Sequence, residues 1–314
     1  MRLSTYQKSA LETDHTDKNF DHKMDRGTIV SMLGLAGELG TLCTTYKKKL
    51  RDGKDYKFHD NHIREELGDT LWYLAVVSNK FGINLDEVAK FNIDKIRGRW
   101  KGQIKKAKNY DAGAPKSQRL PRQFEIIFTQ HQIDGNLRAV MRMDNALLGD
   151  PLTDNADVED GYRFHDAFHI AFLTTLGWSP VLRKLMGRKR KFDKSKDENQ
   201  DGGRAIVIEE GIAALVFEYG SDNGLSNGKQ IIDDELLATL RQMVRRLEVA
   251  ELSSYEWQKS VLLGWKIFSA LKRSKGGRLI CDLDKQEASI KFLRMSDKKI
   301  TSNLLKQKKR ASSE

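Results

Sequence analysis

Apolar residues recur at helical spacing over most of the first hundred residues. Between Gly27 and Leu50 they fall three and four positions apart, at Ile29, Met32, Leu33, Leu35, Ala36, Leu39, Leu42 and Cys43. A turn signal, Asp52-Gly53, ends this run. Similar patterns predict helices at residues 4–12, 61–80 and about 86–106. Four helices are enough for a bundle with a polar cleft.

The pattern changes after this region. Residues 107–122 hold two of the four prolines and lack helical periodicity, which predicts an interdomain linker. Short strand-like runs follow at 124–128 and 137–141, a charged loop at 186–203, and a β-hairpin made by 278–283 and 288–293. Further helices are predicted at 158–176, 204–219, 233–249 and 254–273.

These patterns predict a mainly α protein with two domains. A four-helix bundle occupies residues 1–106, the linker residues 107–122, and a second, mostly helical domain with a small β-hairpin and a basic tail residues 123–314.

Composition fits this picture. In a chain of 314 residues, 32% are charged and 39% hydrophobic, as in helix-rich globular proteins. We expect no membrane span and no signal peptide, because no stretch reaches the necessary apolar length and the first residues lack an apolar core. The two cysteines, Cys43 and Cys281, lie far apart and form no motif, which favours a cytoplasmic location.

The net charge of +11 predicts an affinity for polyanions. Basic residues concentrate at 183–191 and again at 306–310. One interpretation is solvated surface; the other is a funnel for nucleotide phosphates or a contact with nucleic acid. No nucleic-acid-binding module accompanies the charge, so small polyanions are the better expectation and nucleic acid is an unlikely partner.

Acidic residues within the apolar helical patterns indicate chemistry. Glu66 and Asp69 are spaced i, i+3 and therefore leave one face of their helix, while Glu38 lies on the preceding helix. If the two helices pack side by side, these carboxylates share a cleft and repel one another unless a cation neutralises them. Magnesium is the natural candidate, because it takes a few carboxylates and completes its shell with water and phosphate. The alternative is ordinary acidic decoration of exposed helix faces.

Three segments together resemble a known family. The run Gly34-Leu-Ala-Gly-Glu38-Leu-Gly-Thr41, then Glu66-x-x-Asp69-Thr-Leu-Trp-Tyr-Leu, then Asn92-x-x-Lys95-x-x-x-Arg99 is similar to the MazG-like all-α nucleotide pyrophosphohydrolases. The resemblance covers about residues 27–100. It implies magnesium-dependent hydrolysis of nucleoside triphosphates to the monophosphate and pyrophosphate. The cellular role would be cleansing of the nucleotide pool, or depletion of nucleotides under stress or in phage defence.

The resemblance also implies roles for individual residues. Glu38, Glu66 and Asp69 would bind magnesium, and one of them or the neighbouring Glu65 would orient the attacking water. One position departs from the family pattern: Thr41 stands where the family has a second glutamate. A neutral hydroxyl is a poor replacement for a carboxylate, so an alternative is a catalytically weakened bundle that binds nucleotides as a sensor.

A third group of residues shares one helical stripe. Asn92, Lys95 and Arg99 lie at i, i+3 and i+7. By the resemblance, Lys95 and Arg99 grip substrate phosphates and Asn92 contacts phosphate or base; the alternative is a polar outer face. Because short bundles of this type bury their apolar faces by pairing subunits, we expect a homodimer or a larger homo-oligomer.

The second half holds another candidate site. His165 and His169 lie at i, i+4 on one helix face, a geometry that binds metal when a third ligand arrives from elsewhere. Asp166 lies between them, and Glu209 or Glu210 would supply the further ligand. The alternative is a pair of buried, hydrogen-bonded histidines. If this cluster is the working phosphohydrolase centre, the bundle would be regulatory.

Overall fold

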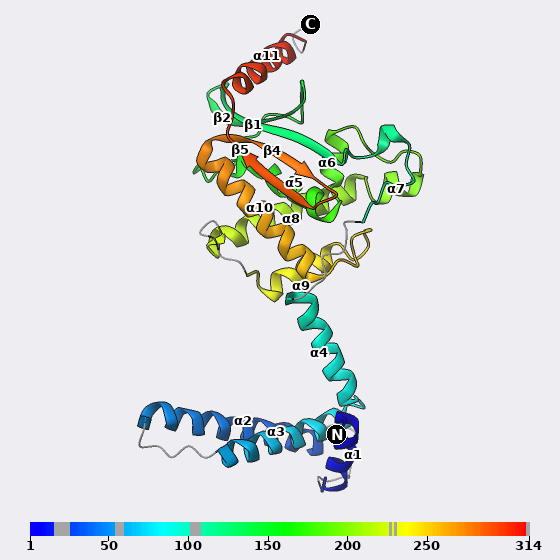
Figure 1. The fold of residues 1–314 in the computed structure, drawn as a ribbon, viewed down its shortest axis with the longest axis vertical. Coiled ribbons are helices and arrows are strands. Elements are labelled where there is room, and N and C mark those ends of the chain that lie inside the picture. Colours follow the sequence, from blue (N-terminus) through cyan, green and yellow to red (C-terminus); the bar gives the residue numbers. More distant parts are fainter. Residues whose placement is uncertain (16–25, 54–59, 101–107, 226–227, 229–230, 312–314) are drawn as a thin grey trace. The chain divides into compact units, whose positions relative to one another are not determined.

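The structure is a computed structural model, and it describes residues 1–15, 26–53, 60–100, 108–225, 228 and 231–311. The chain divides into two compact units, Met1–Arg97 and Gly98–Glu314, each of which is described by itself (Figure 1).

The first unit is built from helices. Its elements are α1 (Leu3–Glu12), α2 (Arg26–Asp52), α3 (Asp60–Lys80) and α4 (Leu85–Trp100). All four begin within a residue or so of the predicted positions. The predicted extension of the last helix beyond Trp100 falls outside the described residues.

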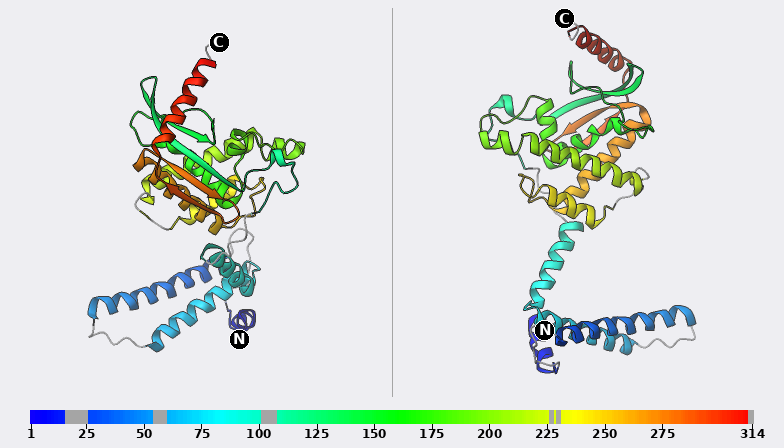
Figure 2. Two further views of the ribbon diagram at one scale, coloured as in Figure 1. Left: turned by 45° about the horizontal axis from the view of Figure 1, so that its top comes forward. Right: turned by 180° about the vertical axis from the view of Figure 1, so that it is seen from behind.

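Helix α3 holds this unit together. It lies alongside α2 (Figures 1 and 2), and its Trp72 Nε1 donates hydrogen bonds to the α1 carbonyl of Ala10 at 3.2 Å and to Thr13 Oγ1 at 2.8 Å. Ala10, Ala75 and Leu85 form a small buried cluster, against which Trp72 packs. Trp72 is therefore a core residue rather than an exposed base-stacking platform.

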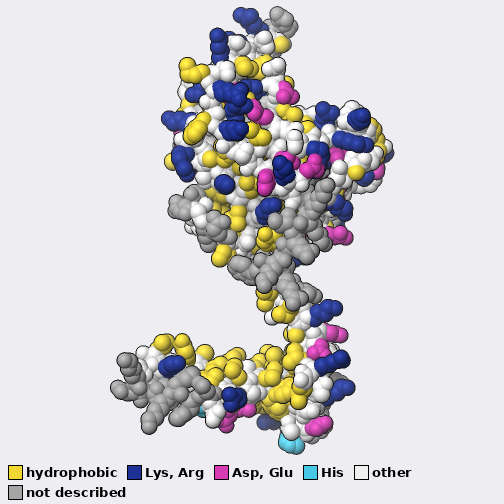
Figure 3. Space-filling view, viewed as in Figure 1, with side chains coloured by type: hydrophobic (Ala, Val, Ile, Leu, Met, Phe, Trp, Pro, Cys, Tyr) yellow, Lys and Arg dark blue, Asp and Glu magenta, His cyan; other side chains and the backbone are white. Residues whose placement is uncertain are grey.

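Many apolar side chains of the first unit remain at the surface. Figure 3 shows hydrophobic side chains gathered over α2 and α3. The large, exposed apolar side chains of the first unit include Ile29, Val30, Met32, Leu33, Leu39, Tyr46, Leu50, Leu67, Leu74, Phe81, Ile83, Val88, Phe91, Ile93 and Ile96. An exposed apolar surface of this kind is typical of an interaction face.

Helix α2 also differs from one expectation. By length and composition alone, it is apolar and long enough to cross a membrane, although no such stretch was predicted. Core helices of soluble proteins have the same properties. The feature by itself therefore does not place the chain in a membrane.

The second unit contains one antiparallel sheet of five strands in the order β3-β2-β1-β4-β5. The strands are β1 (Gln123–Ile133), β2 (Asn136–Met143), β3 (Ala146–Leu147), β4 (Gly276–Asp282) and β5 (Glu287–Lys291). The central strand β1 pairs on one side with β2, where Phe128 faces Met141, and on the other with β4, where Phe128 faces Gly277. The strand-like runs and the hairpin expected separately are thus parts of one sheet.

Helices complete the second unit (Figure 2). They are α5 (Asp166–Leu176), α6 (Pro180–Leu185), α7 (Lys194–Asn199), α8 (Gly203–Asp222), α9 (Asp234–Met243), α10 (Ser254–Ser274) and α11 (Met295–Ala311), with 3₁₀ turns at Lys116–Gln118 and Tyr162–Phe164. Every residue of α5 is buried, because this helix is apolar nearly all round. Helix α10 begins at a capping box made by Ser253 and Glu256 and packs along α5.

Several boundaries differ from the prediction. The predicted helix 158–176 begins at Asp166, because Gly161 adopts a left-handed backbone with φ of 92° and a 3₁₀ turn follows it. The predicted helix 233–249 ends at Met243. The predicted loop 186–203 contains α7, and the basic tail forms α11 up to Ala311.

The described part of the predicted linker, residues 108–122, packs against the second unit. Asp111 and Leu120 are buried, and the Asp111 carboxylate accepts hydrogen bonds from the Leu120 amide and from Arg183, both at 2.8 Å. These contacts place the segment within the second unit rather than between the units.

Candidate functional site

Helices α2 and α3 bring three predicted carboxylates together. Glu38 lies on α2, and Glu66 and Asp69 lie on α3. Glu66 is buried, with 6% of its surface exposed, whereas Glu38 is half-buried and Asp69 is exposed. We refer to these three residues as the carboxylate cleft; one of them is desolvated and two reach solvent.

The negative charges of these three carboxylates affect one another. Partial desolvation, followed by the negative charges of Asp69 and Glu66, raises the pKa of Glu38 above its ordinary value. Glu66 Oε2 is buried and has no hydrogen-bond partner within the described part of the chain. Because a buried carboxylate oxygen is costly to leave unpaired, the donor set fits a hard cation such as magnesium.

A histidine that the sequence analysis did not single out borders the cleft. His62 Nε2 lies 3.4 Å from Glu66 Oε1, and His62 Nδ1 lies 3.7 Å from Glu65 Oε2. The signal was present in the sequence, because His62 precedes these acids by three and four positions on one helix. Glu65 itself is exposed.

Thr41 does not replace the missing carboxylate. Its side chain is exposed, and Thr41 Oγ1 donates to the Gly37 carbonyl of its own helix at 3.3 Å. The hydroxyl is therefore used within α2, and three carboxylates form the cleft.

The predicted phosphate-binding stripe is only partly described. Asn92 is exposed on α4. The backbone of α4 is described through Trp100, but the side chains of Lys95 and Arg99 lie outside the described residues.

A second cluster forms in the second unit between α5 and α8. His169 is fully buried, and its Nδ1 lies 2.9 Å from Oε1 of the equally buried Glu209. The Glu209 carboxylate also accepts from Ser179 Oγ at 2.6 Å and from the Val181 amide at 2.8 Å. Three donors thus satisfy Glu209, so this carboxylate fixes the orientation of the His169 ring.

Glu210 lies on the other side of the His169 ring, near Nε2. Glu210 Oε2 is 3.3 Å from His169 Nε2 and 3.7 Å from His165 Nε2. His165 is 11% exposed at its side chain and donates from Nδ1 to the Tyr162 carbonyl at 3.0 Å. One ligand atom each of His165, Asp166 and His169 lies within 4.8 Å of the others.

Charge within this cluster is strongly coupled. Burial alone would lower the pKa of His169, but Glu209, Glu210 and Asp166 outweigh it and raise the pKa to about 10. Burial would raise the pKa of Glu210, yet hydrogen bonds and charge from His165 and His169 hold it well below its usual range. The structure thus brings together all five residues predicted for this site.

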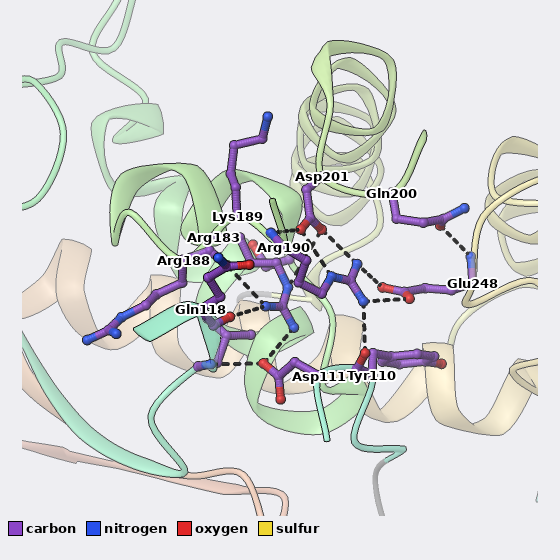
Figure 4. A network of polar contacts seen from close by, with 12 residues as sticks. Tyr110, Asp111, Gln118, Arg183, Arg188, Lys189, Arg190, Gln200, Asp201 and Glu248 are labelled. Carbon is purple, nitrogen blue, oxygen red and sulfur yellow. Dashed lines mark hydrogen bonds and ion pairs between the residues drawn. The ribbon is translucent and has the colours of Figure 1, made fainter. Parts of the chain in front are cut away.

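Two basic residues of the segment 183–191 are neither solvated surface nor part of a phosphate funnel, whereas Lys184 and Lys191 are exposed. Arg183 and Arg190 are buried in a network of ion pairs (Figure 4). Arg190 pairs with Asp201 and Glu248, both at 2.7 Å, and donates to the Tyr110 carbonyl at 3.0 Å. These guanidinium groups therefore tie the segment after residue 107 and the loops around α7 together, and they are not available to a polyanion.

The fold and its sites define a helical bundle with a carboxylate cleft, followed by a unit of helices and an antiparallel sheet with a histidine–carboxylate cluster. Residues 31–103 match the MazG nucleotide pyrophosphohydrolase domain, and residues 105–294, more than half of the chain, match the MazG C-terminal domain. The chain therefore belongs to the MazG nucleotide pyrophosphohydrolase family and carries the MazG C-terminal domain.

One relative is similar to about a third of the chain. The Gene 37 protein of Mycobacterium phage L5 is 31% identical over 101 residues, which cover 32% of this chain and 89% of that protein. No solved structure matches the chain.

Proposed function

We propose that the first unit is a magnesium-dependent nucleoside triphosphate pyrophosphohydrolase that releases the nucleoside monophosphate and pyrophosphate. The observation that carries this proposal is the convergence of Glu38, Glu66 and Asp69, with a buried Glu66 oxygen that lacks a protein partner among the described residues. Membership of the MazG family supports the same reaction class.

In this proposal the three carboxylates bind the metal ion, and neighbouring residues position the groups around it. Glu38, Glu66 and Asp69 hold magnesium, which when bound polarises phosphoryl oxygens and lowers the pKa of a coordinated water. Glu65 or one of the three carboxylates orients the attacking water. His62 restrains Glu66, because its Nε2 lies beside Glu66 Oε1.

The substrate would be held by charge from α4. Lys95 and Arg99 bind the triphosphate, since cations on one stripe of a helix can contact successive phosphates. Asn92 contacts phosphate or base. The cellular role would be cleansing of the nucleotide pool, or depletion of nucleotides under stress or in phage defence.

The assembly and location belong to the same proposal. A second copy of the chain would cover the exposed apolar side chains of α2, α3 and α4, which gives a homodimer or larger oligomer. The cytoplasm, a reducing compartment, suits a protein with two free cysteines.

A second candidate function follows from Thr41. Because its hydroxyl is bonded to Gly37, the cleft offers three carboxylates where the family pattern has four. The bundle would then bind nucleotides with magnesium but turn them over slowly or not at all, as a sensor.

The test is pyrophosphate release from a panel of ribo- and deoxyribonucleoside triphosphates with and without Mg²⁺. Glu66→Gln should reduce turnover by at least about 100-fold, whereas Glu87→Gln, which neutralises an exposed acid in the first turn of α4, should leave it unchanged. Mg²⁺-dependent binding without turnover would favour the sensor. Activity that survives Glu66→Gln but disappears in His169→Ala would place the chemistry in the second unit.

A further inference from the structure

We infer that His165, His169 and Glu210 form a binding site for a divalent transition-metal ion in the second unit, with Glu209 as the residue that positions His169. All residues of this site belong to the second unit. The ion we expect is of the zinc or iron type, because imidazole nitrogens prefer these ions to magnesium.

The hydrogen bonds on the outer side of each ring determine where its lone pair points. Tyr162 offers a carbonyl, which only accepts, so His165 Nδ1 carries the hydrogen. Glu209 already accepts from Ser179 and Val181, so it also acts as an acceptor toward His169 Nδ1. In both neutral rings Nε2 is therefore left with its lone pair.

These two lone pairs meet a third acceptor. Glu210 Oε2 lies 3.3 Å from one Nε2 and 3.7 Å from the other. The Glu210 oxygen repels both lone pairs unless a cation lies between them. The cation is either one or more protons or a metal ion, and the remaining geometry favours the metal.

The separations of the ligand atoms, the hydrogen bond that supports His169 and the access from solvent all agree with a bound metal ion. Ligand bonds of about 2.05 Å in a tetrahedral site place neighbouring ligand atoms about 3.3 Å apart, close to the separations seen here. Asp166 offers an oxygen within 4.8 Å of one ring nitrogen of each histidine. The Glu209 carboxylate behind His169 is the support that metal-bound histidines usually have. Glu210 is 44% exposed at its side chain, which gives the ion a path from solvent.

The experiment uses the full chain with Mg²⁺ in excess, so that the carboxylate cleft is occupied. Zn²⁺ is titrated by calorimetry, and Co²⁺ is added in parallel to read the visible d–d absorption of nitrogen-ligated cobalt. We expect one Zn²⁺ per chain and a Co²⁺ spectrum typical of nitrogen ligands. The same titration in Glu66→Gln should give the same result, because that residue belongs to the first unit.

Variants of the cluster complete the test. His165→Ala should weaken Zn²⁺ binding by about 100-fold or more, since loss of an outer-shell partner alone typically weakens it 10- to 100-fold. Glu210→Gln should weaken binding by at least about tenfold. Glu218→Gln, an exposed acid two turns further along α8, should not alter it. Circular dichroism shows whether each variant folds. The Co²⁺ spectrum of the wild-type chain tests the inference even if a variant does not fold.

Two results would overturn the inference. One is a wild-type chain that binds no Zn²⁺ and gives no such Co²⁺ spectrum in excess Mg²⁺, because protons would then neutralise the cluster. The other is Zn²⁺ binding that His165→Ala and Glu210→Gln leave as tight as in Glu218→Gln.

Discussion

Gly34 lies where α2 passes Tyr73 of α3. A Cβ at this position would overlap the Tyr73 ring, and that ring is held by an edge-on contact with Trp72 at 4.9 Å between centroids. Gly34→Ala should therefore destabilise the first unit by about 1–3 kcal/mol, as overpacking does, despite the better helix propensity of alanine. Chemical unfolding of the full chain, followed by circular dichroism, measures the change.

Gly37 provides the matched control one helical turn away. A Cβ there would meet no atom within 4 Å in the described part of the chain. Gly37→Ala should stabilise α2 by about 0.5–1 kcal/mol, because glycine weakens a helix interior. Equal unfolding midpoints for the two variants would contradict the close approach of α2 and α3.

The two cysteines should differ in reactivity. Cys281 is buried in β4, and burial raises the pKa of its thiol to about 12, whereas Cys43 is exposed. A thiol reagent at pH 8 should modify one thiol per native chain and two after denaturation. Cys43→Ala should abolish the native reaction.

The buried thiol of Cys281 is neutral in the folded protein, and this determines how the stability of the fold changes with pH. In the unfolded chain the thiol ionises near its ordinary pKa of 9.0, so the unfolded state gains stability as pH rises above 9. Cys281→Ala should remove this part of the alkaline destabilisation. Rapid modification of both thiols in the native chain would contradict the burial of Cys281.

Buried arginines connect the elements around α7. Arg190→Met would leave Asp201, which is fully buried, and Glu248 without their common partner. Because breaking a buried ion pair on one side typically costs about 3–5 kcal/mol, the second unit should lose a large part of its stability. Urea unfolding with a probe in the second unit measures this loss.

Lys189→Met is the control for this substitution. Lys189 pairs with Asp197 at 2.8 Å, but both side chains remain more than a quarter exposed. Removal of such a surface pair should change stability by less than about 1 kcal/mol. A similar loss in both variants would mean that the ion-pair network of Figure 4 does not stabilise the unit.

Sequence periodicity predicted the helices well and the sheet poorly, for a physical reason. Helical hydrogen bonds connect near neighbours, so α2, α3, α8 and α10 leave a local pattern. Strand β1 pairs with β4 about 150 residues further along the chain, and no local pattern contains that pairing. The burial of Arg190 was missed for the same reason.

The candidate sites show the same difference between local spacing, which could be predicted, and tertiary contacts, which could not. Spacing within one helix was enough to group Glu66 with Asp69 and His165 with His169. The anchoring of His169 by Glu209, and of Glu209 by Ser179, depends on how α5, α6 and α8 pack. The magnesium-binding role of the first group and the substrate contacts of α4 stay predictions until they are measured.

The two units differ in how completely each buries its own apolar surface. The second has one continuous core that includes Phe168, Trp257 and Trp265. Among its described residues, the first buries few apolar side chains, most of them in a small cluster, and leaves large ones exposed on α2, α3 and α4. A unit with so small a core gains stability chiefly by covering that surface, so the first unit should be the one that self-associates.

This difference makes the assembly state testable with single substitutions. Leu33 on α2 is 67% exposed and Phe91 on α4 is 74% exposed. Leu33→Glu or Phe91→Glu should shift the full chain from a dimer or larger oligomer to a monomer, because a carboxylate would be buried in the apolar contact. Val207→Glu, at a 70% exposed position on α8, should leave the mass unchanged.

Light scattering coupled to size-exclusion chromatography, over a concentration series, measures the mass. A wild-type chain that stays monomeric at every concentration, or a Val207→Glu variant that dissociates as the others do, would contradict self-association through the first unit.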